Sequence, residues 1–260
     1  MKSWKYKQQS LSIETQPDTL QEIIDGKIPA LLIKNFFSPH ICDKIVSKVS
    51  NHSVYDHGSS KLKKVGIFLS AYLNKKEKYF PDAEINNQKI SKIFSDVEDP
   101  IEKINQVIHK ISKIENIIPA AEQKKDYSHG IFRIWENSDF GPLHRDYANF
   151  EAPNFQISRH ENQLSCVLYL QNPTKGGELV IHNKKWEKPD EKFRAIDFGY
   201  SREVIKEVSY EKILPQQGDL IIFNPRFFHE ILPTIGKTKR VTFGFFIGFS
   251  NQDNFAEYWS

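Results

Sequence analysis

The last third of the chain alternates apolar positions with small or polar ones in a way that is typical of β-strands. The clearest case is the run 240–249, in which one face is apolar and the other is small except for one Phe. Successive side chains of a strand point to opposite faces, so this run predicts a strand with one face in the core and one that leaves room for a bound molecule. The apolar face holds Val241, Phe243, Phe245, Ile247 and Phe249, and the other holds Thr242, Gly244, Phe246 and Gly248.

Four shorter apolar runs also predict strands, at 130–135, 163–170, 177–181 and 218–223. They are separated by turn residues and not by helical patterns, which favours an antiparallel sandwich or jelly roll over a parallel α/β sheet. The charged stretch 186–212 lacks such a pattern, and we expect it to be an insertion between strands.

The N-terminal half is predicted to be mostly helical with one early strand. Residues 30–36 form a short apolar run fit for a buried strand, and Ser38-Pro39 follows as an N-cap and a first helical residue. Apolar residues then recur at helical spacing over 87–115 and are interrupted near Pro100, which predicts two helices. We therefore expect an all-β core with flanking helices. Residues 1–125 would form a helical N-terminal support with one early strand, residues 126–260 the jelly-roll core, and both one structural unit.

Size and charge limit the classes of function that the chain can have. The 260 residues carry 36 Lys and Arg against 33 Asp and Glu, and no dense basic block occurs, so a nucleic-acid partner is not expected. No apolar run reaches the length of a membrane span, and the first ten residues lack the apolar core of a signal peptide. Cys42 and Cys166 are far apart, which favours two reduced, buried thiols. We expect a soluble, cytoplasmic protein that acts as a monomer or homodimer on a small molecule.

Three side chains that bind metals stand at spacings that suit a single ion. His144 and Asp146 lie two residues apart, so in an extended segment both can face an ion while Arg145 points elsewhere. His229 follows the predicted strand 218–223 and can approach from a neighbouring strand. Two imidazoles and one carboxylate on one face of a metal leave the opposite face open, which is the arrangement of non-haem Fe(II) oxygenases. The pattern predicts His144, Asp146 and His229 as iron ligands.

Arg240 and Thr242 form a second polar pair at the start of the last predicted strand. A guanidinium fork and a hydroxyl on the same face can hold a carboxylate through charge-assisted hydrogen bonds. We expect the pair to bind the far carboxylate of a 2-oxo acid. An isolated Arg at this place would instead be read as part of a surface ion pair.

Short motifs follow one another through the last hundred residues in a fixed order and spacing. They are the stretches 163–165, 176–180, 218–224, 228–229, 233–237, 240–242, 248–250 and 258–260. With the triad, they resemble Fe(II)/2-oxoglutarate-dependent oxygenases of the prolyl-hydroxylase-like superfamily. Within it, the chain is most similar to the carrier-independent small-molecule halogenases, which include the hapalindole/welwitindolinone type and the free-lysine halogenases. The resemblance implies a double-stranded β-helix, Fe(II) as cofactor, 2-oxoglutarate and O2 as co-substrates, and Arg240 as the 2-oxoglutarate anchor.

Asp146 is the main departure from that group, whose members carry Gly at this position. The missing carboxylate opens a place for chloride on iron, and here the carboxylate fills it. The prediction is therefore hydroxylation of an unactivated C–H bond in a free small molecule, such as lysine or a related metabolite. Low-specificity candidates for substrate contacts lie before, within and after the ligand segments: Arg133, Trp135, Tyr147, Asn149, Phe150, Arg226, Phe246 and Trp259.

Four other readings stay open at this point. The same cofactor chemistry can lead to desaturation, cyclisation or epimerisation, and halogenation would require chloride to bind despite Asp146. A metal-binding jelly roll can also act as a sensor without turnover, although such a barrel has no need of Arg240. A zinc hydrolase can use the same three ligands, but no general-base Glu stands at a diagnostic spacing.

Overall fold

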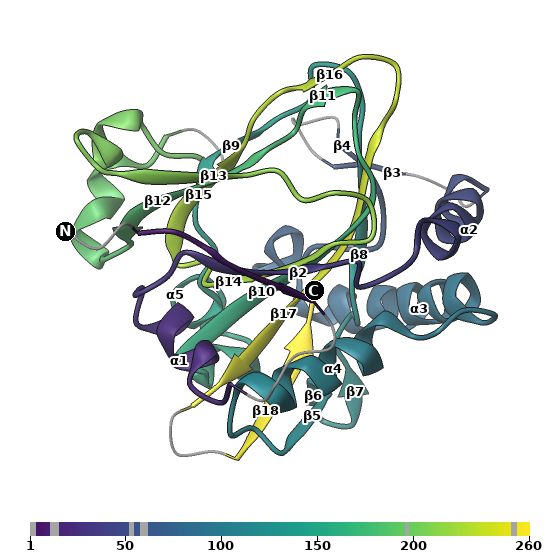
Figure 1. Ribbon diagram of the computed structural model, residues 1–260. Coiled ribbons are helices and arrows are strands. Elements are labelled where there is room, and N and C mark those ends of the chain that lie inside the picture. The colour runs from purple at the N-terminus through teal and green to yellow at the C-terminus, as the bar shows by residue number, and fades with distance from the viewer. Residues whose placement is uncertain (1–3, 11–15, 52–54, 58–61, 196–197, 251–253) are drawn as a thin grey trace.

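Two β-sheets face each other in the computed structural model, and helices cover the outer side of the larger one (Figure 1). The structure describes residues 4–10, 16–51, 55–57, 62–195, 198–250 and 254–260. The prediction about a signal peptide rested in part on residues 1–3, which lie outside the described residues. The arrangement is the jelly roll that the strand pattern predicted.

In the described part of the chain, the major sheet has ten strands and is mostly antiparallel, with parallel pairing only between β1 and β2 and between β18 and β5. Its main path runs β1 (Lys7–Ser10), β2 (Ala30–Lys34), β14 (Leu220–Phe223), β10 (Asn162–Gln171), β17 (Arg240–Phe249), β8 (Ile131–Trp135), β4 (Leu62–Val65) and β3 (Tyr55–His57), and β18 (Phe255–Trp259) and β5 (Asn116–Pro119) join at β17.

The minor sheet has four antiparallel strands and lies at the upper left of Figure 1. Its order is β13 (Tyr210–Ile213), β12 (Leu179–Lys185), β15 (Phe227–Ile231) and β9 (Gly141–His144). Two small pairs complete the β structure: β11 (Lys175–Gly176) with β16 (Thr234–Ile235), and β6 (Ala121–Glu122) with β7 (Lys125–Asp126).

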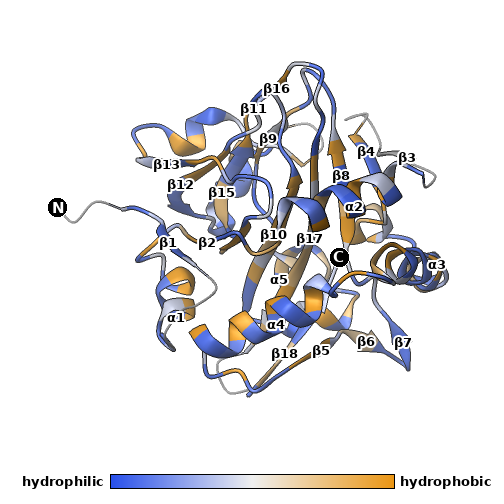
Figure 2. Cartoon of the chain, turned by 45° about the vertical axis from the view of Figure 1, so that its right-hand side comes forward, coloured by the Kyte–Doolittle hydropathy of each residue, from blue (hydrophilic) through white to orange (hydrophobic). Residues whose placement is uncertain are grey.

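Four helices pack on the outer face of the major sheet, and their amphipathic stripes are visible as orange and blue bands in Figure 2. They are α1 (Thr19–Ile24), α2 (Pro39–Ser50), α3 (Lys76–Phe94) and α4 (Pro100–Ile111). The hydroxyl of Ser38 accepts a hydrogen bond from the Ile41 backbone N–H, so the predicted N-cap of α2 is confirmed. The predicted break at Pro100 is the start of α4. Shorter helices are α5 (Ala148–Glu151) and the 3-10 turns η2 (Leu69–Tyr72), η3 (Gln156–Arg159), η4 (Lys188–Phe193) and η5 (Arg202–Ile205).

The two faces of β17 have the separate environments that its alternation predicted. Val241, Phe243 and Phe245 are buried in the core that the helices share with the major sheet. Thr242 and Phe246 point to the other side and line a cavity between the two sheets. A strand with this pattern thus separates the hydrophobic core from the binding site.

The N-terminal part of the chain contains more strand than expected. Besides β2, it supplies β1, β3, β4 and β5 to the major sheet, so the prediction of a single early strand was wrong. These strands are three or four residues long and β1 reads Lys-Gln-Gln-Ser, so no hydrophobic alternation marks them. They form strands because they pair with the edge of a sheet that other strands have built.

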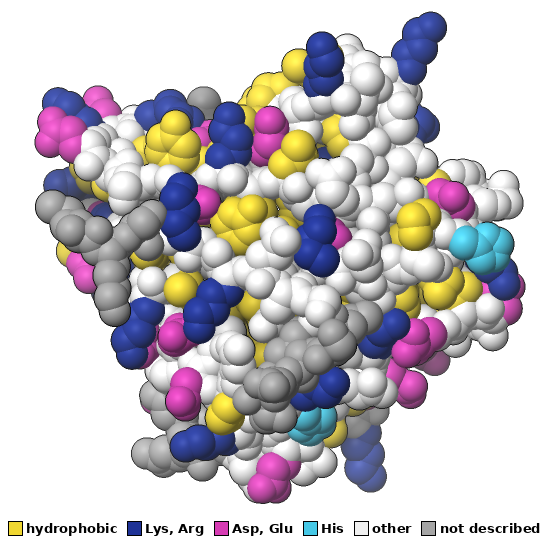
Figure 3. All heavy atoms as spheres, viewed as in Figure 1, with side chains coloured by type: hydrophobic (Ala, Val, Ile, Leu, Met, Phe, Trp, Pro, Cys, Tyr) yellow, Lys and Arg dark blue, Asp and Glu magenta, His cyan; other side chains and the backbone are white. Residues whose placement is uncertain are grey.

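The cysteines, the helices and the surface charges bear on three broader predictions. Cys42 and Cys166 are buried and free, as predicted. Among the described helices, none is long and apolar enough to cross a membrane. On the face shown in Figure 3, basic and acidic side chains are interspersed, in keeping with the balanced composition.

Candidate metal centre and active site

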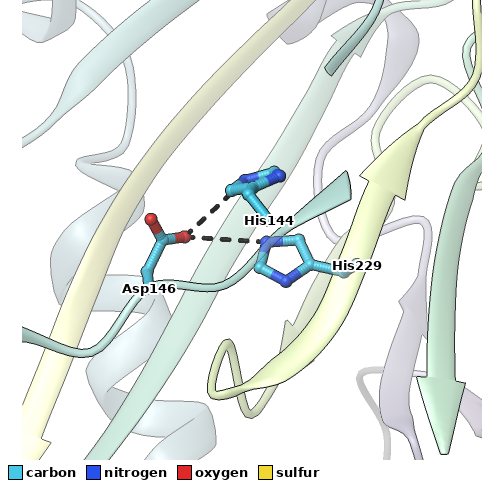
Figure 4. A group of neighbouring side chains, drawn as sticks. All are labelled: His144, Asp146 and His229. Carbon is cyan, nitrogen blue, oxygen red and sulfur yellow. Dashed lines mark ion pairs between the residues drawn. The ribbon is translucent and has the colours of Figure 1, made fainter. Parts of the chain in front are cut away.

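His144, Asp146 and His229 converge from two adjacent strands of the minor sheet and the segment after one of them (Figure 4). His144 is the last residue of β9 and is the direct cross-strand partner of His229 in β15. The two rings therefore lie side by side, with centroids 4.2 Å apart. Asp146 follows β9, and its backbone N–H donates to the Pro225 carbonyl at 2.9 Å, which fixes the segment against the turn before β15.

The ligating atoms of the three residues all lie within 4.8 Å of one another. Asp146 Oδ2 is 3.9 Å from His144 Nε2 and 3.6 Å from His229 Nε2. The other nitrogen of each ring is occupied: His144 Nδ1 is 2.7 Å from the Pro142 carbonyl and His229 Nδ1 is 2.8 Å from the Phe227 carbonyl. A carbonyl only accepts, so Nδ1 carries the proton and the Nε2 lone pair faces the cluster.

The electrostatics of the cluster favour the protonation states that bind a cation. Burial, together with the adjacent His229, lowers the pKa of His144 to about 4, so its imidazole is neutral at neutral pH. Burial alone would raise the pKa of Asp146, but the two imidazoles and Arg133 outweigh it and lower that pKa to about 2. Neutral imidazole nitrogens and an ionised carboxylate are the states a metal requires. The residues present thus fit a divalent ion with two His and one carboxylate ligand.

Arg240 lies in the same cavity with hydrogen-bonding capacity to spare. Its side chain is buried, with 2% of the residue exposed, and Nη2 donates to the Tyr169 hydroxyl at 2.9 Å. Its Nε and the Thr242 hydroxyl have no hydrogen-bond partner, and the same holds for the indole N–H of Trp135. Among the described residues, no carboxylate lies within ion-pair distance of Arg240. Buried polar groups are normally satisfied, so this set of donors fits a bound anion such as a carboxylate.

The cavity between the sheets has a volume of about 460 Å³, which is within the usual range for small-molecule sites. The three clustered ligands, Arg240 and Thr242 all line it. The structure also brings five of the eight predicted substrate contacts to its wall: Arg133, Trp135, Tyr147, Phe246 and Trp259.

The other three predicted contacts point away from the cavity. Asn149 donates from Nδ2 to the Ser158 carbonyl at 2.7 Å and connects α5 to η3. Phe150 packs on the Trp186 ring at 4.7 Å between centroids. Arg226 donates from Nε to the Trp186 carbonyl and stacks on Tyr147. Proximity in sequence to the ligands suggested these residues, but their side chains turn elsewhere, Asn149 towards η3 and Phe150 and Arg226 towards Trp186 of the insertion.

The insertion between β12 and β13 forms one wall of the cavity and is joined to the ligand segment through Arg145. The Arg145 side chain has no exposed surface and makes ion pairs with Glu151 at 2.6 Å and Glu191 at 3.0 Å. Its guanidinium also stacks on Trp186 at 4.3 Å from the ring centroid. Phe198, from the same insertion, packs edge-on against His144. Arg145, which lies between His144 and Asp146, thus connects their segment to the cavity wall.

Sequence reasoning missed Tyr169, Phe198 and the η2 segment as parts of the site. Tyr169 belongs to a predicted strand and pairs with Thr242 across β10 and β17. Only that register shows that its hydroxyl meets Arg240. The insertion is charged and lacks a hydrophobic pattern, so its sequence gave no indication that Phe198 would contact His144.

The sequence of the chain matches a known protein family. Residues 8–260 match the family described as carrier-protein-independent halogenase WelO5. The leucinostatins biosynthesis cluster protein S of Purpureocillium lilacinum is 35% identical over 149 residues, which cover 52% of this chain and 60% of that protein. The chain therefore spans less than two thirds of this relative's length.

Solved structures share the fold at low sequence identity. An N-substituted L-amino acid dioxygenase from Burkholderia ambifaria AMMD superposes with a TM-score of 0.62 and 14% identity, over 93% of this chain and 90% of that one. HygX from Streptomyces hygroscopicus, solved with nickel and 2-oxoglutarate, gives a TM-score of 0.50 and 12% identity over 86% and 84% of the two chains.

The fold thus puts the chain in the class of jelly-roll proteins that includes the N-substituted L-amino acid dioxygenase. Within that class, the chain belongs to the carrier-protein-independent halogenase WelO5 family, since the match covers nearly its whole length. The predicted relationship to the carrier-independent halogenases is confirmed.

Proposed function

We propose that the protein is a dioxygenase that hydroxylates an unactivated C–H bond of a free small molecule, an amino acid or a related metabolite. The observation that carries this proposal is the carboxylate of Asp146, which lies 3.6 Å and 3.9 Å from the two imidazole Nε2 atoms. With His144 and His229 it forms a complete set of three protein ligands for Fe(II).

The chain's own residues prepare the metal site before any ion binds. Backbone carbonyls hold both imidazoles in the tautomer that presents Nε2, and cross-strand pairing keeps the rings adjacent. Arg145 anchors the segment between His144 and Asp146 to two carboxylates of the surrounding wall. Such supporting contacts orient metal ligands and raise the affinity of the site.

Arg240, Tyr169 and Thr242 would hold the far carboxylate of 2-oxoglutarate. The guanidinium is positioned by the Tyr169 hydroxyl, and the Arg240 Nε and Thr242 hydroxyl are available as donors. Bound iron and 2-oxoglutarate supply the activation of O2 that an unactivated C–H bond requires. The protein's part is to orient the co-substrate and substrate and to keep water out of the apolar cavity.

Halogenation is the second candidate because of the family to which the chain belongs. In the resemblance drawn from sequence, the halogenases carry Gly at the position of Asp146, and chloride takes the freed place on iron. A carboxylate beside both imidazoles occupies that place here. We therefore favour hydroxylation.

The test is a comparison of wild type with Asp146→Gly in buffers with and without chloride. The protein, reloaded anaerobically with Fe(II), receives 2-oxoglutarate, O2 and a panel of free small molecules, and products are read by mass. Wild type should release succinate and add one oxygen atom to the substrate independently of chloride, and Asp146→Gly should lose this reaction. A chlorine isotope pattern in the wild-type product would instead establish halogenation.

A further inference from the structure

Some of the charged side chains that line the cavity are already paired with oppositely charged neighbours. Arg145 and Arg194 both make ion pairs with Glu151, at 2.6 Å and 3.6 Å. Asp139 accepts a hydrogen bond from the Glu136 backbone N–H at 2.6 Å through Oδ2 and thereby closes a turn at the rim. In the described lining, the charged groups without an oppositely charged partner are therefore Asp139 at the rim and, deeper in the cavity, Asp146, Arg240 and Arg133.

Arg133 is a cation turned into the cavity without an anionic partner. It lies on β8 opposite Thr242 of β17, and its guanidinium stacks on the Phe68 ring at 5.0 Å from the centroid. A Cβ at Gly244 would lie 2.9 Å from Arg133 Nη1, so the glycine leaves the space that this guanidinium occupies. Among the described residues, no carboxylate lies within 4.0 Å of Arg133. Burial lowers its pKa, yet a guanidinium remains charged at neutral pH.

The charge of Arg133 stays uncompensated when the proposed cofactors are counted. Under the proposed function, on which this step rests, Asp146 and the two carboxylates of 2-oxoglutarate offset the Fe(II) ion and Arg240. Asp146 and Arg240 are the charges that act on Arg133 most strongly, and the second of them repels it. A half-buried cation without a compensating charge favours an anionic ligand and disfavours a cationic one.

The rim of the cavity carries exposed aromatic side chains besides Asp139. Phe140 and Phe198 line it although they are 57% and 41% exposed, and Phe68, Leu69 and Leu73 line it from the η2 region. Exposed aromatic side chains at the rim of a cavity indicate contact with an apolar ligand. A substrate would thus contact the cationic Arg133 inside the cavity and apolar side chains at its mouth.

We propose that Arg133 binds the carboxylate of the organic substrate, and that this substrate is a monocarboxylate with an apolar body and no free ammonium group. An amino acid of this class would have its nitrogen acylated or otherwise uncharged. Free lysine lies outside the class, because its two ammonium groups would need two carboxylates. Besides the ligand Asp146, the described lining offers only Asp139 without a cation partner, and Asp139 Oδ2 already accepts from the Glu136 backbone N–H.

The experiment uses the anaerobic complex of the enzyme with Fe(II) and 2-oxoglutarate. Its visible charge-transfer absorption reports 2-oxoglutarate binding, and a shift of that band reports binding of an organic molecule next to the metal. The probes are aliphatic and aromatic monocarboxylates and N-acyl amino acids, each paired with its primary amide, plus free lysine and leucine. The variants are Arg133→Gln and Arg133→Lys. Arg202→Gln, which removes a surface cation paired with Glu230 outside the cavity, is the matched control.

Wild type should bind the acids at least about tenfold more tightly than their amides, which is what one charge-assisted hydrogen bond provides. Arg133→Gln should remove this difference, Arg133→Lys should restore part of it, and Arg202→Gln should keep it. In both Arg133 variants the 2-oxoglutarate titration should stay within about twofold of wild type, since Arg240 holds the co-substrate.

Two results would overturn the assignment while leaving the proposed function intact. Loss of the charge-transfer band in Arg133→Gln would mean that Arg133 serves 2-oxoglutarate. Equal or tighter binding of amides or free lysine to wild type would refute the substrate class. Absence of the band in wild type itself, with Fe(II) and 2-oxoglutarate present, would instead refute the proposed function and this inference with it.

Discussion

Replacing Arg240 by Met should separate the stability of the protein from its ability to bind 2-oxoglutarate. The guanidinium is buried with one hydrogen bond to Tyr169 and an unsatisfied Nε. Without an anion it has a desolvation cost that Met, of similar length and apolar, would not have. The ligand-free variant should therefore be as stable as wild type or more so, although it loses the co-substrate site.

The size of the binding defect follows from the burial of the pair. Removing one partner of a buried ion pair costs about 3–5 kcal/mol, and the lower figure weakens binding by about 100-fold. At a concentration of about 100 times the wild-type Kd, 2-oxoglutarate would stabilise wild type by about 2.7 kcal/mol and the variant by about 0.4 kcal/mol. For a chain of this size, these correspond to increases in Tm of about 5–11 °C and about 1–2 °C.

The assay is thermal unfolding under anaerobic conditions with Fe(II), with and without 2-oxoglutarate. Thr242→Ala is the graded comparison, because it removes one hydroxyl donor and leaves the guanidinium in place. Its shift should lie between those of wild type and Arg240→Met. A shift in Arg240→Met as large as that of wild type would refute the reasoning, since the co-substrate would then be held elsewhere.

Three further outcomes follow from the contacts. Arg145→Met should destabilise the protein by about 3–5 kcal/mol in urea unfolding, because Glu151 and Glu191 lose a buried partner; an unchanged midpoint would contradict this. The hydrogen bond from His182, with Arg202, lowers the pKa of Glu230 to about 2 from 4.5. The resulting stability is present above pH 4.5 and lost as pH falls towards 2, so Glu230→Gln should flatten the acid limb of a stability profile. Tyr169→Phe should raise the KM for 2-oxoglutarate several-fold at nearly unchanged kcat, because it frees the Arg240 side chain.

The strands that sequence analysis located are those with an apolar run or a hydrophobic alternation of their own. The predicted run 240–249 is β17 itself, and the run 163–170 lies within β10. The strands that carry the ligands were not recognised, because β9 is four residues long and contains Pro142, and β15 is almost continuously buried. Short strands of this kind are defined by their partners and not by their own pattern.

The cluster of His144, Asp146 and His229 was predictable because such a group of side chains is local and rare. His144 and Asp146 share one segment, and the third ligand needed only a neighbouring strand. The place of Tyr169 beside Arg240 depends on its cross-strand register with Thr242, which no single stretch of sequence encodes. The same limit explains why Asn149, Phe150 and Arg226 were proposed as substrate contacts: sequence proximity does not fix the direction of a side chain.

The central claim is that this site transfers oxygen from O2 to a bound small molecule. The most direct measurement is a single-turnover reaction of the Fe(II)- and 2-oxoglutarate-loaded enzyme with isotopically labelled O2 and a substrate from the carboxylate panel, read by mass. We predict one labelled oxygen atom in succinate and one in the hydroxylated product. In His229→Ala, neither product should carry the label. Labelled succinate accompanied by a chlorinated or a desaturated product would contradict the assignment of hydroxylation, and failure to form any labelled succinate would contradict the account as a whole.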